Sequence, residues 1–340
     1  MNRRAATATV FAAVVCALAV SVAGCGESKP KVVERPRETP VVLAPPEPEP
    51  PAPKEPPTDF GPWSDMGFGR YMLPKEKFWS DDGAVDIVFH FHAGEAAERD
   101  YRKTSLKAIV VSETWGTFSG PYTAAFEDTY RFGRMVGAIV AAAKSITKVP
   151  TIHRGRIALV AWSAGYGSIQ EILKDARYRE WVDTVVLLDG LHTGHLKGDG
   201  EGPRPVDGRP ISMFTRFAKE AAAGRKTMVI THSSIVPEGY ASTTETVQFV
   251  ANEVGAKRSE ERFLPELPES KVPATLEIDM DGGVSPATTP MKQIFRADVG
   301  RFHALGYEGT EARDHIRHLR LLDEILTAWV VPAWSTDSAK

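Results

Sequence analysis

Apolar runs with strand character alternate with helical stretches from about residue 64 onward. The strands expected from these runs cover residues 85–92, 107–111, 157–162, 182–188 and 227–230, with a last strand within 293–305. The expected helices cover residues 96–102, 126–144, the stretch after 163, 211–223 and about 311–329. Strands separated by helices imply a parallel sheet, and near-continuous apolar runs fit strands buried on both sides. We therefore predict one α/β domain over residues 63–335, with a mostly parallel central sheet, helices on both faces and a short tail at 336–340.

The first 24 residues have the pattern of an export signal. Arg3 and Arg4 precede an apolar run over 5–22, and small residues stand before Cys25. A charged start, an apolar middle and a small-residue cleavage site are typical of secretory signals. The cysteine directly after that site resembles a bacterial lipobox, which implies cleavage before Cys25 and lipidation of its thiol. An uncleaved membrane anchor and a plain signal peptide are the alternatives. Gly26 favours the outer membrane over the inner membrane of a cell envelope.

Residues 25–62 are rich in proline, glutamate and lysine and have few apolar side chains to bury. This composition favours extended polyproline II, and we interpret the segment as a disordered tether between the lipid anchor and the domain. The chain has two cysteines, Cys16 and Cys25, so the exported domain is expected to have neither a disulfide nor a free thiol. The net charge of -3 gives no reason to expect a nucleic-acid partner.

Ser163 stands at the junction of an apolar strand and a helix, between small residues. Ala161 and Gly165, two positions on either side, leave room for the strand and the helix to approach closely. This resembles the nucleophile elbow of the α/β-hydrolases, normally Gly-x-Ser-x-Gly, with the first glycine replaced by alanine. The alternative is an ordinary strand–helix turn with a capping serine. The resemblance covers residues 80–332 and implies a three-layer fold and a serine hydrolase of the esterase or lipase type.

A nucleophilic serine needs a histidine to take its proton and a carboxylate to orient that histidine. In the family, the order along the chain is serine, acid, histidine. Asp189 follows the strand after the elbow and is the expected acid, although the family more often places its acid one strand later. Glu238 is the alternative acid. His315, at the start of the last helix, is the expected base, with His303 and His318 as alternatives.

The resemblance also implies an oxyanion hole made of backbone amides, because a developing negative oxygen needs fixed donors. One amide is that of Ala164, directly after the serine. The other is that of Ala93 or Gly94, since the segment from His90 to Gly94 resembles the His-Gly type of oxyanion loop. No cofactor is needed for this chemistry.

Two alternatives from other classes remain open. His90 and His92 are spaced so that both rings face one side of a strand, and they could bind a metal together with Asp189, His192 and His195. The protein would then be a metal-dependent hydrolase, although the spacing matches no strong zinc signature. Alternatively, it keeps the fold without the chemistry and acts as a binding protein of the envelope.

Aromatic residues near the predicted strand ends could line an acyl or sugar pocket, or belong to the core: Trp115, Tyr122, Trp162 and Tyr166. The loop over 194–208 and the helix over 211–223 occupy the usual cap region of the family, where they either gate access or only connect strands. The expected partners are an envelope substrate with an ester or other acyl bond and the membrane. The sequence does not choose the substrate or the oligomeric state.

Overall fold

The computed structural model describes residues 55–197, 204–258 and 291–337. All of them belong to one compact unit over Pro53–Lys340. The predicted signal peptide, Cys25 and most of the predicted tether lie outside the described residues. Within them, Phe60 is buried and Thr58 N donates a hydrogen bond to Thr104 O, so residues just before 63 also pack onto the domain. No described helix has the length and apolar character needed to cross a bilayer.

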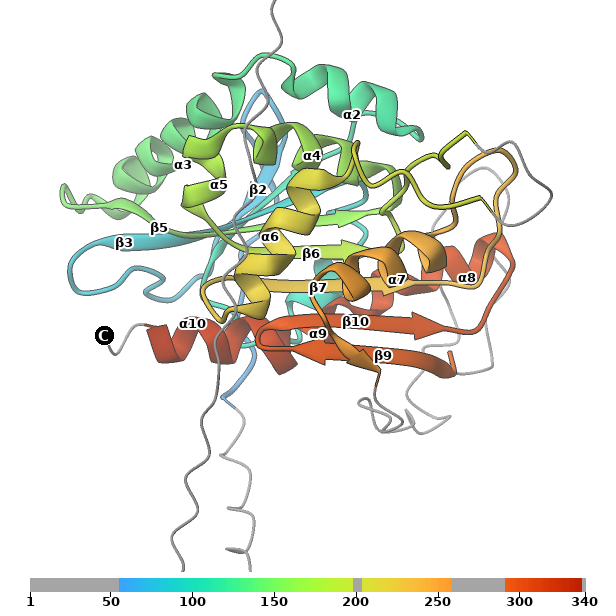
Figure 1. The fold of residues 1–340 in the computed structure, drawn as a ribbon. Helices are drawn as coiled ribbons and strands as arrows, with labels where there is room; N and C mark the ends of the chain where they lie inside the picture. The colour runs from blue at the N-terminus through green and yellow to red at the C-terminus, as the bar shows by residue number, and fades with distance from the viewer. Residues whose placement is uncertain (1–54, 198–203, 259–290, 338–340) are drawn as a thin grey trace, which may run out of the picture. The chain divides into compact units, whose positions relative to one another are not determined.

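A single mixed sheet forms the centre of the domain (Figure 1). The order of its described strands is β1-β2-β4-β3-β5-β6-β7-β10-β9-β8. The run from β4 to β10 is parallel, and β1, β2, β9 and β8 are added antiparallel at the two sides. The strands are β1 Ser64–Asp65, β2 Arg70–Met72, β3 Ala84–Phe91, β4 Ile109–Glu113, β5 His153–Trp162, β6 Val182–Leu188, β7 Thr227–His232, β8 Lys257–Arg258, β9 Gln293–Val299 and β10 Phe302–Tyr307.

Helices cover both faces of this sheet, because each face carries its own buried apolar cluster. One face packs against α2 Ser119–Phe126, α3 Arg131–Thr147, α4 Tyr166–Lys174, α5 Ala176–Trp181, α6 Ser212–Ala222 and α7 Thr243–Glu253. The other packs against α1 Glu98–Tyr101 and the C-terminal run of α8 Ala312–Arg317, η3 His318–Leu321, α9 Leu322–Ile325, η4 Leu326–Val330 and α10 Val331–Asp337. The predicted α/β class, with a mostly parallel sheet and helices on both faces, is confirmed.

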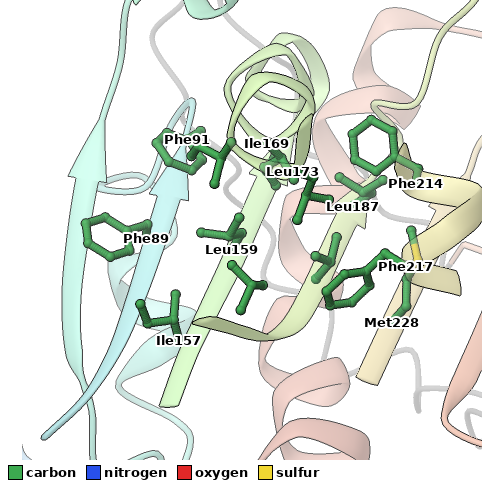
Figure 2. Close-up of a cluster of buried hydrophobic side chains, with 14 of the residues drawn as sticks. Phe89, Phe91, Ile157, Leu159, Ile169, Leu173, Leu187, Phe214, Phe217 and Met228 are labelled. Atoms are coloured by element: carbon green, nitrogen blue, oxygen red, sulfur yellow. The ribbon is translucent and has the colours of Figure 1, made fainter. Parts of the chain in front are cut away.

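The larger cluster shows how helix α6 is placed (Figure 2). Phe214 and Phe217 of α6 are buried and point at Leu187 of β6 and Met228 of β7. Burying an aromatic side chain of this size stabilises the fold by about 2–3 kcal/mol. Helix α6, predicted over 211–223, therefore packs on one face of the sheet as a connecting helix and does not gate access to a site.

Three expected elements differ from the observed ones. The last strand, expected within 293–305, is a hairpin of β9 and β10 joined at Gly300, whose φ of 56° suits glycine. The helix expected over 126–144 is α3, which begins at Arg131 and ends at Thr147, and Phe126 instead ends the separate helix α2. The helix expected over 311–329 is divided into short α, 3-10 and π turns. Helix α7 was not predicted, although the Ser242–Glu245 capping box marks its start.

Candidate active site

Ser163 lies at the sharp turn that the sequence predicts. Strand β5 ends at Trp162, and Ser163 itself opens the 3-10 turn before α4, with a left-handed φ of 49°. A side chain is rarely held in this conformation, which costs about 1–3 kcal/mol and is maintained by surrounding contacts. One of these surroundings is the close packing of Gly165 against β3, where an added Cβ would lie 2.1 Å from the carbonyl oxygen of Phe91. The turn thus presents Ser163 at the carboxyl edge of the sheet.

Asp189 follows the carboxyl end of β6 and is buried. Its Oδ1 accepts hydrogen bonds from Ser233 N at 2.8 Å and from Thr243 Oγ1 at 2.6 Å. Its Oδ2 lies 2.7 Å from Nδ1 of His315. Burial raises the pKa of the Asp189 carboxyl, but nearby His318 and the hydrogen bonds from His315 and Thr243 outweigh it and hold the pKa below its usual range. Asp189 is therefore an ionised, fixed acceptor.

His315, on α8, is oriented by two neighbours. Its Nδ1 donates to Asp189, so in the neutral ring Nε2 carries the lone pair that can take a proton. The imidazole stacks on the indole of Trp162, with ring centroids 4.9 Å apart and planes 30° apart. Trp162 Nε1 also donates to the carbonyl oxygen of His315 at 3.0 Å. The His315 side chain is 24% exposed, so a substrate can reach it.

Two backbone neighbours bring Ser163 close to the Asp189–His315 pair. Trp162, which stacks on His315, directly precedes Ser163. Gly190, directly after Asp189, packs on the serine: an added Cβ there would lie 2.4 Å from Ser163 O and 2.9 Å from Ser163 N. In the part of the chain that the structure describes, no hydrogen bond joins the Ser163 hydroxyl to His315. Catalytic hydrogen bonds of unliganded enzymes often form only when the substrate binds.

The predicted oxyanion loop leaves the sheet at β3 in an unusual conformation. His92 and Ala93 have φ values of 72° and 60°. Ala93 N donates to Thr114 Oγ1 at 3.2 Å, and an added Cβ at Gly94 would lie 2.7 Å from Ser112 Oγ. Ala164 is in the first helical turn, where amides have no intrahelical acceptor. Because the Ala93 amide is engaged by Thr114, the amides of Ala164 and Gly94 are the better candidates for a free donor.

His92 is held by Tyr122 of α2, which is itself hydrogen bonded to the loop after β4. The Tyr122 hydroxyl lies 2.5 Å from His92 Nδ1, accepts from Trp115 N at 3.1 Å and donates to Gly116 O at 3.0 Å. Since the hydroxyl has one hydrogen, His92 Nδ1 is the donor in its own contact. Burial, followed by the charge of nearby His315, lowers the pKa of His92 to about 4. His92 is therefore a neutral ring beside the candidate base.

The alternative bases and the alternative acid have other partners, although His318 lies near Asp189. His303 is near the amino end of β10, pairs with Asp298 at 2.7 Å and stacks on Trp329, at the edge of the sheet opposite Ser163. His318 is fully buried and bonds Thr231 Oγ1 at 2.7 Å. Glu238 is exposed on the loop after β7. In the described residues, none of the three forms a linked acid–base pair beside Ser163.

The histidines proposed as metal ligands have separate partners. His90 Nδ1 bonds the Tyr101 hydroxyl at 2.9 Å, whereas His92 bonds Tyr122, because the left-handed φ of His92 ends the alternation of the strand. His195 pairs with Glu245 at 3.1 Å. His192 lies between the rings of Tyr166 and Tyr240. Within residues 55–197, 204–258 and 291–337, no group of three or more His, Cys, Asp or Glu side chains could hold a metal ion.

Of the predicted pocket aromatics, Tyr122 and Trp162 are buried, Tyr166 is partly buried, and Trp115 is 39% exposed. Tyr240, 45% exposed, joins Tyr166 and His192 at the same edge and was not predicted. Ser233 and Thr243, which fix Asp189, were also missed. Ser233 directly follows β7 and Thr243 begins α7. This position is the signal that sequence reasoning could have used, since neighbouring strand ends meet at one edge.

Comparisons with known proteins give little further information. A scan against protein-family models and a search of curated proteins both found no match. Among solved structures, Est1E from Butyrivibrio proteoclasticus is similar at 11% sequence identity and a TM-score of 0.35, over 80% of this chain and 98% of that one. A similarity this weak carries no conclusion about activity, and the site itself must supply the argument.

Proposed function

We propose that the protein is a serine hydrolase that cleaves an ester or other acyl bond with Ser163, His315 and Asp189. The observation that supports this most strongly is the 2.7 Å contact between Asp189 and His315, formed beside a serine whose φ is 49°. A carboxylate that fixes the histidine tautomer, next to a serine on a strained strand–helix turn, is the arrangement that serine hydrolysis requires.

In this mechanism, Ser163 Oγ attacks the acyl carbon while its proton passes to Nε2 of His315. Asp189 holds Nδ1 and stabilises the resulting imidazolium. The amides of Ala164 and of Gly94 or Ala93 stabilise the oxyanion. The proton then moves from His315 to the leaving group, whose bond to the acyl carbon breaks. Water hydrolyses the acyl-serine by the same route in reverse.

The test is labelling of the full-length protein with a fluorophosphonate probe. Wild type should label, Ser163→Ala should not, and Ser145→Ala, which changes an exposed serine of α3, should label like wild type. Asp189→Asn should reduce the labelling rate about 10³-fold or more, because the amide favours the wrong tautomer of His315. A folded wild type that does not label contradicts the proposal and favours a binding role.

We also propose that the protein is anchored to the cell envelope through lipidated Cys25, on the lipobox-like sequence alone. Metabolic labelling with an alkyne fatty acid in a bacterial host should mark the wild type. Cys25→Ser should abolish the label, whereas Cys16→Ser should keep it. A label that persists in Cys25→Ser would contradict this anchoring.

A further inference from the structure

The indole of Trp162 stacks with two imidazoles. His315 stacks on it at a centroid distance of 4.9 Å with planes 30° apart, and His92 stacks on it at 4.8 Å and 24°. Trp162 is 2% exposed, so its indole is shielded from solvent. The indole is also tied to the backbone of α8 by its hydrogen bond to His315 O.

We propose that Trp162 is a positioning residue that fixes the His315 ring and favours its imidazolium form by presenting a π face to it. This inference rests on the proposed function, because His315 becomes an imidazolium only when it takes the proton of Ser163. Tryptophan is the side chain that attracts a cation best through its ring face, at centroid distances up to about 6 Å. The stack at 4.9 Å is within that range.

The two imidazoles are not equivalent. His92 is kept neutral by burial, with a pKa lowered to about 4, and its Nδ1 is engaged with Tyr122. His315 is a quarter exposed and has an ionised carboxylate on its Nδ1. The indole therefore stacks with one ring that stays neutral, His92, and with one that becomes charged, His315.

Charged and titratable groups from several elements surround His315. Asp189 at the end of β6 hydrogen bonds its ring. Burial, and to a smaller extent the charge of His315, lowers the pKa values of His92 after β3, His192 after β6 and His318 on η3. Asp314 and Arg317 are neighbours on α8 itself and pair with each other at 3.3 Å. These three histidines are kept neutral, so Asp189 and the ring face of Trp162 are the groups that stabilise the imidazolium of His315.

The proton balance of the step is simple. The O–H bond of Ser163 breaks as its oxygen bonds the acyl carbon, and the proton bonds Nε2 of His315. The positive ring stays between Asp189 and Trp162 until Nε2 returns the proton to the leaving group. The electrostatic effect of the Trp162 ring face is thus exerted while the His315 ring is charged, whereas the stacking positions the ring in both forms.

A second Asp–His–Trp group provides an internal control. His303 Nδ1 lies 2.7 Å from Asp298 Oδ1, and its ring stacks on Trp329 at 4.8 Å and 28°. The distances and the tilt nearly match those around His315. This group lies at the opposite edge of the sheet, away from Ser163.

The experiment is an NMR titration of the histidine ring protons in the full-length protein. Trp162→Leu removes the π face and should lower the pKa of His315 by about 0.5–1 pH unit, whereas Trp162→Phe should recover at least half of that. Both variants lose the indole N–H, so their difference isolates the ring face. Trp329→Leu should leave the pKa of His315 unchanged and lower that of His303.

The rate of fluorophosphonate inactivation against pH gives a second readout. Its acidic limb should move to lower pH in Trp162→Leu by the same amount as the NMR value, with the plateau reduced about 3- to 10-fold. If Trp162→Leu does not fold, uniform 5-fluorotryptophan, which weakens the ring face but keeps its shape, should lower both histidine pKa values.

The outcomes separate the two proposals. Equal His315 pKa values in wild type, Trp162→Leu and Trp162→Phe overturn the role of Trp162 even if Ser163 labels. A wild type that does not label, but whose His315 pKa falls in Trp162→Leu, overturns the serine mechanism and leaves the stacking effect standing.

Discussion

At the scale of single residues, backbone strain is concentrated at the candidate site. The described residues other than glycine with positive φ include His92, Ala93, Ser163 and Asp189, all at the carboxyl edge of the sheet, and Lys148, which ends α3. Strained residues persist only where their surroundings hold them, and they gather at functional sites. The sequence did not predict these conformations, because histidine, alanine, serine and aspartate usually have negative φ.

The φ of Ser163 predicts an order of stability for two variants at this position. Ser163→Gly should be more stable to urea than Ser163→Ala by about 0.5–1 kcal/mol, because glycine adopts a φ of 49° without a Cβ clash. Equilibrium unfolding measures the difference. The same pair made at Ser145, on a helix, should show the opposite order, with alanine more stable.

The order of Ser163, Asp189 and His315 along the chain was enough to select them as candidates, and the contact between Asp189 and His315 is observed, whereas their catalytic roles stay a prediction. The aromatic stack was not predictable, since nothing in the spacing of His92, Trp162 and His315 shows that their rings meet. Such contacts depend on how two separate strand ends and a helix pack together.

At the scale of elements, the Ser163 turn depends on a close approach to β3. Gly165→Ala would place a Cβ 2.1 Å from Phe91 O, which is backbone and cannot rotate away. We expect this change to lower the free energy of unfolding by about 1–3 kcal/mol and to reduce labelling at Ser163. Gly137→Ala, on α3 with open space at its Cβ, is the matched control and should be neutral or stabilising. Equal effects of both changes would contradict the argument.

Some elements were predicted well because their pattern is local. The run from 182 to 188 is observed as β6 with the same bounds. The hairpin of β9 and β10 was predicted as one strand, since the turn at Gly300 is too short to interrupt the apolar pattern. The C-terminal helical run was predicted as continuous, because its breaks come from packing across the second face of the sheet.

At the scale of the whole molecule, buried histidines predict sensitivity to acid. Burial lowers the pKa of His90 to about 3, and lowers the pKa values of His92 and His318 to about 4. In the unfolded chain these groups bind protons below about pH 6.5. The unfolded state therefore binds more protons between pH 6.5 and pH 4, and stability is lost as the pH falls through this range.

Urea unfolding at pH 7.5, 5.5 and 4.5 should show this loss in the free energy of unfolding. His318 should contribute at most about 3 kcal/mol to it. His318→Asn should be less stable than wild type at pH 7.5, since it disturbs the contact with Thr231, and should lose less stability on acidification. A variant that loses as much as wild type would contradict the role of His318.

The hydrogen bonds around Asp189 have an evolutionary consequence. Its carboxylate is bound by Ser233 and Thr243, so the point that it occupies lies within reach of the end of β7 as well as of β6. Under the proposed mechanism, an acid supplied from either strand would meet the same imidazole. The acid could then move between neighbouring strands while His315 and Ser163 stay in place. Ser233→Asp in an Asp189→Asn background should therefore recover part of the lost labelling rate, as an ancestral relocation of the acid would require.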